Sequence, residues 1–418
     1  RIEAEARMNP VLLKPKKDDV SQVIVLGRPY RDMNVPAYYG EFTTEEGPKV
    51  VKEAYRHLAS RFDAVVIEGA GSPAEINIAD VDLANMMTAE IADAPCLLVV
   101  NIEWGGAFAY AYGTLMLLPP ERRARFKGII INNMHGSAAD LRSGIDELER
   151  LTGIPVLGVI PHIEHALPDE DSQGLDDRGG EGVRVGVIRL PHMANFTDFD
   201  ALEIGGGASV TFIDRPSEVA AADAIIIPGT KNTVADLQWL RRKGLDRAIV
   251  DARGKVPIIG VCGGYQMLGG RIEDPNGVEG DEGGSYEGLG LIRSVSRFGA
   301  YEKRTVRVEG TMADGEGEVR GYEIHMGATE SEESPLFLLR SDRGVRGEGS
   351  ISPDGMVMGT YVHGLFDRPS FRSRFLSLAG NSGSRSVIDY DAAVEESLSR
   401  VARTVEEHLD IDTMLKIM

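Results

Sequence analysis

The sequence contains few cysteines and a small share of basic charge. Two of its 418 residues are cysteine, Cys96 and Cys262, and they lie far apart in apolar segments. Two cysteines of this kind exclude a disulfide framework and predict a reducing, cytoplasmic compartment. Lysine and arginine number 45 against 65 aspartates and glutamates, so the formal net charge is −20. This balance argues against nucleic acid as a partner, because binding to phosphates requires clustered basic side chains.

Long hydrophobic runs are also missing. No apolar stretch reaches the roughly 20 residues that a membrane-spanning helix requires, and the opening RIEAEARMNP does not have the pattern of a secretory signal. We therefore expect neither a membrane partner nor export. Hydrophobic residues make up 42% and charged residues 26% of the chain, which is the balance of a globular protein. A chain of 418 residues is long enough for two or three domains.

What the sequence does contain is a repeated alternation of short apolar runs with amphipathic helical stretches. This alternation predicts an α/β fold with two parallel sheets, each covered by helices on both faces. The expected buried strands of the first half are 21–27, 62–69, 95–101, 127–133 and 154–161, and those of the second half are 183–191, 208–214, 223–229 and 256–264.

Between the two halves the alternation stops. Residues 164–182 (EHALPDEDSQGLDDRGGEG) are acidic and rich in glycine, which is typical of a linker. We therefore expect one α/β domain over 1–163 and a second over 183–380. The end of the chain has helical spacing and many charged residues, so 381–418 are expected to form a helical tail.

Cys262 lies where an expected strand meets an expected helix. In VPIIGVCGGYQML small residues surround the cysteine, and a helix is expected to begin near Tyr265. A strained turn of this type presents the sulfur of a nucleophile and aims the next backbone N–H, that of Gly263, at a developing oxyanion. A second oxyanion donor is expected near Gly229, in the Pro-Gly turn after the neighbouring strand. The alternative is a buried, inert cysteine, which the flanking glycines make the less favoured hypothesis.

A cysteine nucleophile needs a base, and the chain has eight histidines. His325, in GYEIHMG, and His363, in GTYVHGLFD, each follow a short β-like run. A single histidine of this kind is more often structural than catalytic, but an exposed cysteine nucleophile requires one as its partner. His57 and His408 occur in charged helical patterns, and His135, His162, His165 and His192 occur in loops or at strand ends.

The motifs GVCGGYQMLG and GTYVHGLFD together resemble the class I, triad-type glutamine amidotransferase domain in its cobyric acid synthase subtype. This resemblance implies a flavodoxin-like fold, with Cys262 as the residue that attacks the glutamine amide and His363 as the base. Triad enzymes usually carry a glutamate two residues after that histidine. Here the position is Leu365, as in this subtype, so the third member is not assignable from sequence. His325 also matches a family motif and is expected to serve structure or substrate contact.

The first half contains VVIEGAGSPAEINI (65–78), in which an expected strand ends in a carboxylate and a glycine-rich turn follows. A carboxylate there can hold Mg²⁺ against phosphates, while glycine N–H groups approach an anion. The motif resembles the dethiobiotin-synthetase-like ATP domain of cobyric acid synthases, and MNPVLLKP, TGIPVLGVIPH and LPHMANFTDFDAL extend the resemblance through both halves. The resemblance implies a Mg²⁺ ligand at Glu68 and contacts with ATP or substrate at Gly71, Ser72, Glu75 and Asn132.

The family converts adenosylcobyrinic acid a,c-diamide to adenosylcobyric acid in cobalamin biosynthesis. The resemblance therefore implies a glutamine-hydrolysing carbon–nitrogen ligase with glutamine, ATP·Mg²⁺ and a corrinoid as substrates. Four peripheral carboxylates (b, d, e and g) are activated in turn as acyl phosphates, which ammonia then attacks. Two alternatives stay open: cobyrinic acid a,c-diamide synthase, which has the same two domains, and an ATP-deficient relative that acts as a binding or glutaminase subunit. LPHMANFTDFDAL favours the cobyric type, and retention of Cys262 and His363 argues against a pure scaffold.

Three features depart from the family pattern. No G-x-x-x-x-G-K-[ST] sequence occurs, although the family has such a P-loop upstream of MNPVLLKP. We therefore expect the first domain to lack its first strand and P-loop because the sequence is truncated, with a P-loop on a separate polypeptide as the alternative. The expected partner is a separate P-loop segment or a further copy of the chain in a homo-oligomer. The family's DIDRGGVFA reads NIEWGGAFA, with Asn101, Glu103 and Trp104 in place of Asp, Asp and Arg. The family's NKFRG reads NNMHG, with Asn133 and His135 at basic positions, and a tryptophan does not replace an arginine clamp.

Overall fold

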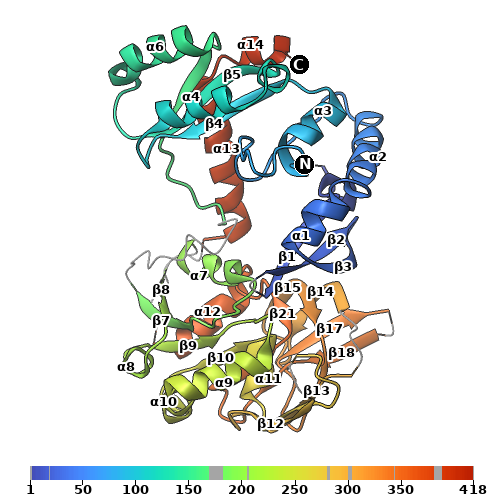
Figure 1. The fold of residues 1–418 in the computed structure, drawn as a ribbon. Helices are drawn as coiled ribbons and strands as arrows, with labels where there is room; N and C mark the ends of the chain where they lie inside the picture. Colours follow the sequence, from blue (N-terminus) through green and yellow to red (C-terminus); the bar gives the residue numbers. More distant parts are fainter. Residues whose placement is uncertain are drawn as a thin grey trace. The chain divides into compact units, whose positions relative to one another are not determined.

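The computed structural model describes residues 2–17, 19–168, 182–204, 207–279, 283–299, 304–342, 344–380 and 388–417. The chain forms two compact units, of which the first comprises residues 1–164 and 399–418 and the second residues 165–398 (Figure 1). Most of the expected linker, residues 169–181, lies outside the described residues. In the described part of the chain, no helix is long and apolar enough to cross a membrane.

The first unit contains a three-stranded parallel sheet in the order β4–β5–β6, formed by Cys96–Asn101, Phe126–Met134 and Val156–Pro161. These strands confirm the predictions at 95–101, 127–133 and 154–161. Helices α4 (Ala107–Leu117) and α6 (Arg142–Thr152) lie in the connections between successive strands, as parallel pairing requires. Ile129 and Ile131 of β5 are fully buried and form one core with side chains of β4, α4 and α6.

A second sheet of this unit is antiparallel, with the order β1–β2–β3 (Val11–Lys17, Val20–Val25 and Arg28–Asn34). The expected strand at 21–27 is therefore present as β2, which ends at Val25, but the prediction that it belongs to a parallel sheet was wrong. The reason is the tight connection that follows: Leu26 and Gly27 both have positive φ, +48° and +75°. A two-residue turn with this backbone joins neighbouring strands of a hairpin and cannot lead into a parallel crossover.

Residues 62–69 were expected to form a further buried strand, and this prediction was also wrong. The segment has no strand conformation, and Val66 is 92% exposed. An apolar run becomes a strand only where a neighbouring strand satisfies its backbone N–H and C=O groups. Among the described residues, no sheet includes residues 62–69 as a strand. Glu68 consequently lies on exposed coil and not at a strand end.

The C-terminal residues complete the first unit. Helix α13 spans Tyr390–His408, and α14 spans Ile411–Ile417. The N–H of Asp410 donates to the carbonyl of Leu157, at 2.8 Å, and Leu409 forms an isolated bridge with Gly158 of β6. A side chain at Gly158 would bring its Cβ within 2.1 Å of the His408 carbonyl oxygen, so glycine permits this close approach. The remaining helices of the unit are α1 (Val35–Ala37), α2 (Gly47–Ala59), α3 (Thr88–Ala92) and α5 (Pro120–Arg123).

The second unit is built on a six-stranded sheet in the order β19–β20–β10–β9–β7–β8. All pairs are parallel except that of β19 with β20, so the expected α/β architecture with parallel sheets is confirmed. The predicted strands correspond to β7 (Val183–Ile188), β8 (Ala208–Ile213), β9 (Ala224–Ile227) and β10 (Ile258–Val261); β19 is Ser350–Ile351 and β20 is Val357–Thr360. The associated helices are α7 (Asp200–Ile204), α8 (Pro216–Val219), α9 (Thr233–Lys243), α10 (Leu245–Ala252), α11 (Gly263–Leu268) and α12 (Pro369–Leu378).

Two smaller sheets accompany the central one. The first has the order β12–β11–β13–β16 and the second β18–β17–β14–β15–β21. The strands of the first are Arg271–Asp274 (β11), Gly284–Glu287 (β12), Ser294–Arg297 (β13) and Ala328–Ser331 (β16). Those of the second are Arg304–Met312 (β14), Glu318–His325 (β15), Phe337–Ser341 (β17), Gly344–Glu348 (β18) and Val362–His363 (β21). The short strand β21 carries His363 into the second of these sheets.

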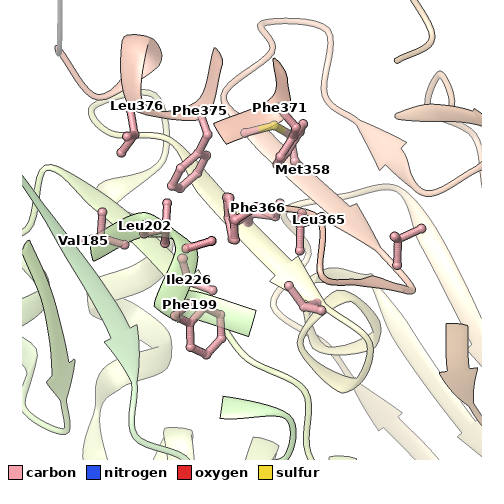
Figure 2. Close-up of a cluster of buried hydrophobic side chains, with 14 of the residues drawn as sticks. Val185, Phe199, Leu202, Ile226, Met358, Leu365, Phe366, Phe371, Phe375 and Leu376 are labelled. Carbon is pink, nitrogen blue, oxygen red and sulfur yellow. The ribbon is translucent and has the colours of Figure 1, made fainter. Parts of the chain in front are cut away.

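One buried cluster fixes two segments that are distant in the sequence. Phe199 and Leu202 come from the segment after β7, and Leu365 and Phe366 come from the segment after β21 (Figure 2). All four are at most 2% exposed, and the burial of these apolar side chains holds both segments in place. The polar residues next to these anchors, Asp198 and His363, are thereby brought together.

Candidate functional site

Cys262 lies in a strained turn between β10 and α11. Its φ of +53° and ψ of −110° are rare for a residue with a side chain, and a conformation of this kind costs about 1–3 kcal/mol. The N–H of Cys262 donates to the carbonyl of Thr360, at 2.8 Å, which ties the turn to β20. Helix α11 begins at Gly263 and not near Tyr265, so the sulfur stands directly at the start of a helix.

The glycines around Cys262 are required by packing. A Cβ on Gly263 would lie 2.5 Å from Thr230 Cγ2, and a Cβ on Gly264 would lie 2.0 Å from the carbonyl oxygen of Ile227. Gly229, on the loop after β9, occupies the space between the two expected catalytic side chains. A Cβ there would lie 3.2 Å from His363 Cε1 and 3.6 Å from Cys262 Cβ. The structure therefore brings Cys262, His363, Gly229 and Gly263 into one place.

His363 is buried, with 1% of its side chain exposed, and it is paired with Asp198. Its Nδ1 lies 2.6 Å from Asp198 Oδ2, while the N–H of Gly364 donates to Asp198 Oδ1 at 2.9 Å. Burial by itself lowers the pKa of His363, but the charge and hydrogen bond of Asp198, with a hydrogen bond to Cys262, outweigh it and raise the pKa to about 10. The arrangement thus stabilises an imidazolium next to the sulfur.

Asp198 is the site residue that the sequence did not reveal. It belongs to the short 3-10 helix Phe196–Phe199, is 3% exposed, and follows Asn195, whose positive φ of +55° turns the chain toward the site. The amide nitrogen of Asn195 lies 3.0 Å from His363 Nδ1. A signal was present in FTDFD, where a charged residue alternates with apolar ones, but 165 positions separate Asp198 from its partner.

The position that carries a glutamate in triad enzymes is apolar in this chain and belongs to the core. Leu365 is fully buried in the cluster of Figure 2. An unpaired carboxylate at this buried position would be costly. The carboxylate that contacts His363 belongs instead to Asp198, on the segment after β7.

Strand β15 forms the wall of the site. Tyr322 is paired with His363 across the strands, and the two rings are stacked at 5.2 Å between centroids. The Cys262 thiol points to the carbonyl of Ile324, at 3.7 Å. His325 stacks on Tyr361 at 3.9 Å, and its Nδ1 lies 3.1 Å from the carbonyl of Gly327. These contacts give His325 a structural place at the end of β15, next in sequence to Ile324.

A buried carboxylate holds the turn that leads into His363. Glu348 accepts hydrogen bonds from Thr360 Oγ1 and from the N–H of Tyr361, both at 2.7 Å. Burial, which is the largest cause, raises the pKa of Glu348 to about 7 despite these donors. The nearby carboxylate Glu323 raises it further and is itself paired with Arg346 at 2.6 Å.

The expected ATP-site residues of the first unit lie on exposed coil and at the end of one strand. Gly71 has a φ of +66° with open space above it, and the hydroxyl of Ser72 accepts from the N–H of Ala74, at 3.2 Å. Glu68 and Glu75 are exposed. Asn132 lies at the end of β5, where its carbonyl accepts from the N–H of Ile102, at 3.0 Å.

In the described part of the chain, residues 68–75 are hydrogen-bonded among themselves and to Asn85. Asn85 holds the turn at Ala70 with two hydrogen bonds. Its Oδ1 accepts from the N–H of Ala70, at 3.1 Å, and its Nδ2 donates to the Ala70 carbonyl, at 2.8 Å. The part of the chain that the structure describes has no group of three His, Cys, Asp or Glu side chains that could hold a metal ion. Glu68 therefore offers a single exposed carboxylate, which suits a cation that takes its other ligands from phosphates and water.

Comparisons with known proteins match both halves of the chain. Residues 184–371 match the family model of a CobB/CobQ-like glutamine amidotransferase domain, and residues 35–169 match that of an AAA domain. The chain is 45% identical to a probable cobyric acid synthase of Methanosarcina mazei, over 99% of this chain and 85% of that protein. It is 42% identical to a cobyric acid synthase of Photorhabdus laumondii, over 100% of this chain and 85% of that protein.

Proposed function

The chain belongs to the cobyric acid synthase family, and on this basis we propose that it is a cytoplasmic enzyme that amidates the b, d, e and g carboxylates of adenosylcobyrinic acid a,c-diamide. Ammonia for the four amidations comes from glutamine, and ATP activates each carboxylate. The observation that carries the proposal is the contact of Cys262 with a buried His363–Asp198 pair. A chain with only a structural role has no need of this arrangement.

In the glutaminase half of the reaction, Cys262 is the nucleophile. The His363 imidazolium and the start of α11 favour the thiolate, which attacks the amide carbon of glutamine. The oxyanion that forms accepts hydrogen bonds from backbone N–H groups at Gly263 and Gly229. When the C–N bond breaks, His363 gives its proton to the leaving nitrogen, and ammonia departs from a thioester. Water, deprotonated by His363, then hydrolyses the thioester to glutamate and regenerates the thiol.

Asp198 acts through His363 and is a positioning residue. Its carboxylate fixes which ring nitrogen carries a proton and stabilises the imidazolium that the thiolate requires. The N–H of Gly364 holds the carboxylate in the plane where it meets Nδ1. The acid of this triad therefore stands on the segment before α7 and not two residues after the histidine.

In the ligase half, a corrinoid carboxylate attacks the γ-phosphorus of ATP and releases ADP. Ammonia then displaces phosphate from the acyl phosphate, and the amide forms with loss of a proton. We place Gly71 and Ser72 near the phosphates, because the open, left-handed turn at Gly71 exposes backbone N–H groups. Glu75 contacts ATP or a corrinoid carboxylate, and Asn132 is the proposed contact of the adenine. Glu68 would hold Mg²⁺, which supplies charge neutralisation on the phosphates when bound.

The mass of the corrinoid tests this function. Adenosylcobyrinic acid a,c-diamide is incubated with the chain, Mg²⁺, ATP and glutamine, with a parallel sample in which ammonium chloride replaces glutamine. Four successive acid-to-amide mass changes in both samples support the synthase. Cys262→Ala is expected to lose the changes with glutamine and keep those with ammonium. An unchanged corrinoid in both samples, with glutamine hydrolysed at full rate, would exclude a synthase activity of this chain alone.

A further inference from the structure

Two exposed aromatic side chains, Trp104 and Tyr110, follow β4 in the first unit. Glu103 and Trp104 are the two central residues of a turn that the hydrogen bond from the Gly105 N–H to the Ile102 carbonyl closes, at 3.0 Å. Gly105 and Gly106 have positive φ, +75° and +72°, so the backbone can reverse here without strain. The indole of Trp104 is 80% exposed, and an exposed aromatic ring can stack on a flat ligand.

Tyr110 extends the aromatic surface onto α4. Its ring lies over Gly106, where a Cβ would come within 3.5 Å of Tyr110 Cε2, yet the side chain is 59% exposed. The opposite side of the helix is buried in the core through Ala107, Ala111 and Leu115. The exposed face of α4 is therefore not a core face that has lost its neighbours, because the helix already has a buried side.

Polar side chains from three strand ends are linked next to this turn, and we name Glu103, Asn133, His135 and His162 the edge cluster. Asn133 Nδ2 lies 2.5 Å from Glu103 Oε2, and Asn133 Oδ1 lies 2.7 Å from His162 Nδ1. His135 Nε2 lies 3.7 Å from Glu103 Oε1, and the two imidazoles stack at 4.4 Å. Because β4, β5 and β6 are parallel, their ends meet at one edge, the usual location of a ligand in such a sheet.

The edge cluster fixes what its histidines can offer a ligand. A carboxylate only accepts hydrogen bonds, so the amide nitrogen of Asn133 must face Glu103 and its oxygen must face His162. His162 therefore donates from Nδ1 to Asn133, and its Nε2 is left for a ligand. The two imidazoles stack at 4.4 Å, so together they present one polar surface of a size that suits a single carboxylate.

We propose that this edge binds the corrinoid, with one face of the macrocycle on Trp104 and Tyr110 and a rim carboxylate on the His135–His162 pair. The inference rests on the proposed function and names the substrate contacts of that site. A corrin is a broad, largely apolar ring with single carboxylates on its rim, which matches an aromatic surface beside a site for one charge. The triphosphate of ATP carries several negative charges, which the edge cluster with its own carboxylate does not neutralise.

The positions involved are those at which this chain departs from its family. Glu103, Trp104, Asn133 and His135 all differ from the residues expected there, and the structure shows three of them bonded within one network together with His162. The network therefore forms one polar site beside the exposed rings of Trp104 and Tyr110.

Equilibrium dialysis of the full chain against coloured corrinoids tests the inference. The ligands are adenosylcobyrinic acid a,c-diamide and cobinamide, whose rim carboxylates are all amidated. Trp104→Ala is expected to weaken both by about tenfold, the order found for stacking on an aromatic side chain, and Trp104→Phe to retain most of the affinity. His135→Asn with His162→Asn is expected to weaken the diamide by about tenfold and leave cobinamide unchanged. Leu117→Ala, which removes another exposed apolar side chain, is the matched control and should change neither.

The two tryptophans allow a second readout. In a Trp239→Phe chain Trp104 is the remaining tryptophan, and its fluorescence should respond to the corrinoid and not to Mg²⁺·ATP. A Trp104→Ala chain that binds both corrinoids as tightly as the wild type, or a Trp104 signal that follows ATP alone, would overturn the inference. If such a chain still amidated the corrinoid, the proposed function would stand without this contact. A wild-type chain that neither binds nor amidates any corrinoid would contradict both.

Discussion

Asp198→Asn isolates what the carboxylate contributes to the His363–Cys262 pair. The substitution keeps the shape of the side chain and removes its charge. Asp198 now accepts from His363 Nδ1 at 2.6 Å and from the Gly364 N–H at 2.9 Å. An asparagine has one oxygen for these two donors. If that oxygen stays with Gly364, the amide NH₂ faces Nδ1, and the ring proton must move to the nitrogen that serves Cys262.

The size of the effect follows from the charge that is lost. Asp198 is the main favourable contribution that raises the pKa of His363 from 6.5 to about 10. If the substitution returned the pKa of His363 fully to 6.5, the imidazolium would lose about 5 kcal/mol of stabilisation. This figure is an upper bound, because Asn195 and Cys262 also contact the ring. With half to three quarters of that bound expressed in the transition state, turnover of glutamine should fall by about 70- to 600-fold. The change should appear in kcat, since Asp198 contacts the base and not the substrate.

Alkylation of Cys262 by iodoacetamide, measured against pH, is the direct assay. A Cys96→Ser background removes the second thiol; burial raises the pKa of Cys96, so its contribution is small in any case. In the wild type Asp198 keeps His363 protonated up to a pKa of about 10, whereas in Asp198→Asn the ring should lose its proton at lower pH, so the pH profiles of the two alkylations should differ. Asp236→Asn is the matched control, because Asp236 is another fully buried aspartate bonded to a histidine, His192, at 2.7 Å. An Asp198→Asn chain with the wild-type pH profile and kcat would refute the reasoning.

Three further predictions follow from the same contacts. Gly264→Ala should destabilise the second unit by about 3 kcal/mol or more, because its Cβ would meet the Ile227 carbonyl at 2.0 Å. Thermal unfolding checks this, and the control is Gly113→Ala in helix α4, which has open space and should not be destabilised. Glu348→Gln should remove a pH dependence of the protein's stability. Burial raises the pKa of Glu348 from 4.5 to about 7, so the wild-type free energy of unfolding falls as the pH rises from about 4.5 to about 7. Relative to the wild type, the free energy of unfolding of the variant should rise by up to about 3 kcal/mol between about pH 5 and pH 8, as measured by urea unfolding. If the free energies of unfolding of the two chains vary with pH in parallel, the prediction is wrong. Glutaminase activity should be low without corrinoid and ATP, because uncoupled ammonia escapes to solvent; full-rate hydrolysis by the chain alone would show that the two sites are not coupled.

Much of the fold is visible in the sequence because buried parallel strands consist of continuous apolar runs. Strands β5 and β10 are examples, with fully buried isoleucines at Ile129, Ile131 and Ile258. The same signal fails at 62–69. An apolar run indicates that a buried strand can form, but it does not indicate whether a neighbouring strand is present to pair with it. The parallel assignment of 21–27 failed for a related reason, since the direction of pairing depends on the turn at Leu26 and Gly27.

The candidate site was predictable where its residues are close in sequence. Cys262, Gly263 and Gly264 form one local turn, so the residue types alone indicated a nucleophile at the start of a helix. The partner acid was not predictable, because Asp198 reaches His363 through the packing of Phe199 and Phe366 in one core. Local patterns do not encode such a meeting of distant segments. The network that joins Glu103, Asn133 and His162 was hidden for the same reason.

The measurement to make first is the mass of adenosylcobyrinic acid a,c-diamide after incubation with this chain, Mg²⁺ and ATP, with glutamine in one sample and an ammonium salt in the other. A synthase that draws ammonia from Cys262 gives four acid-to-amide changes in both samples. The Cys262→Ala chain then gives them with ammonium alone. Glutamine-dependent amidation that persists in Cys262→Ala would contradict the assignment of the nucleophile. A corrinoid of unchanged mass in every sample would contradict the assignment of the reaction.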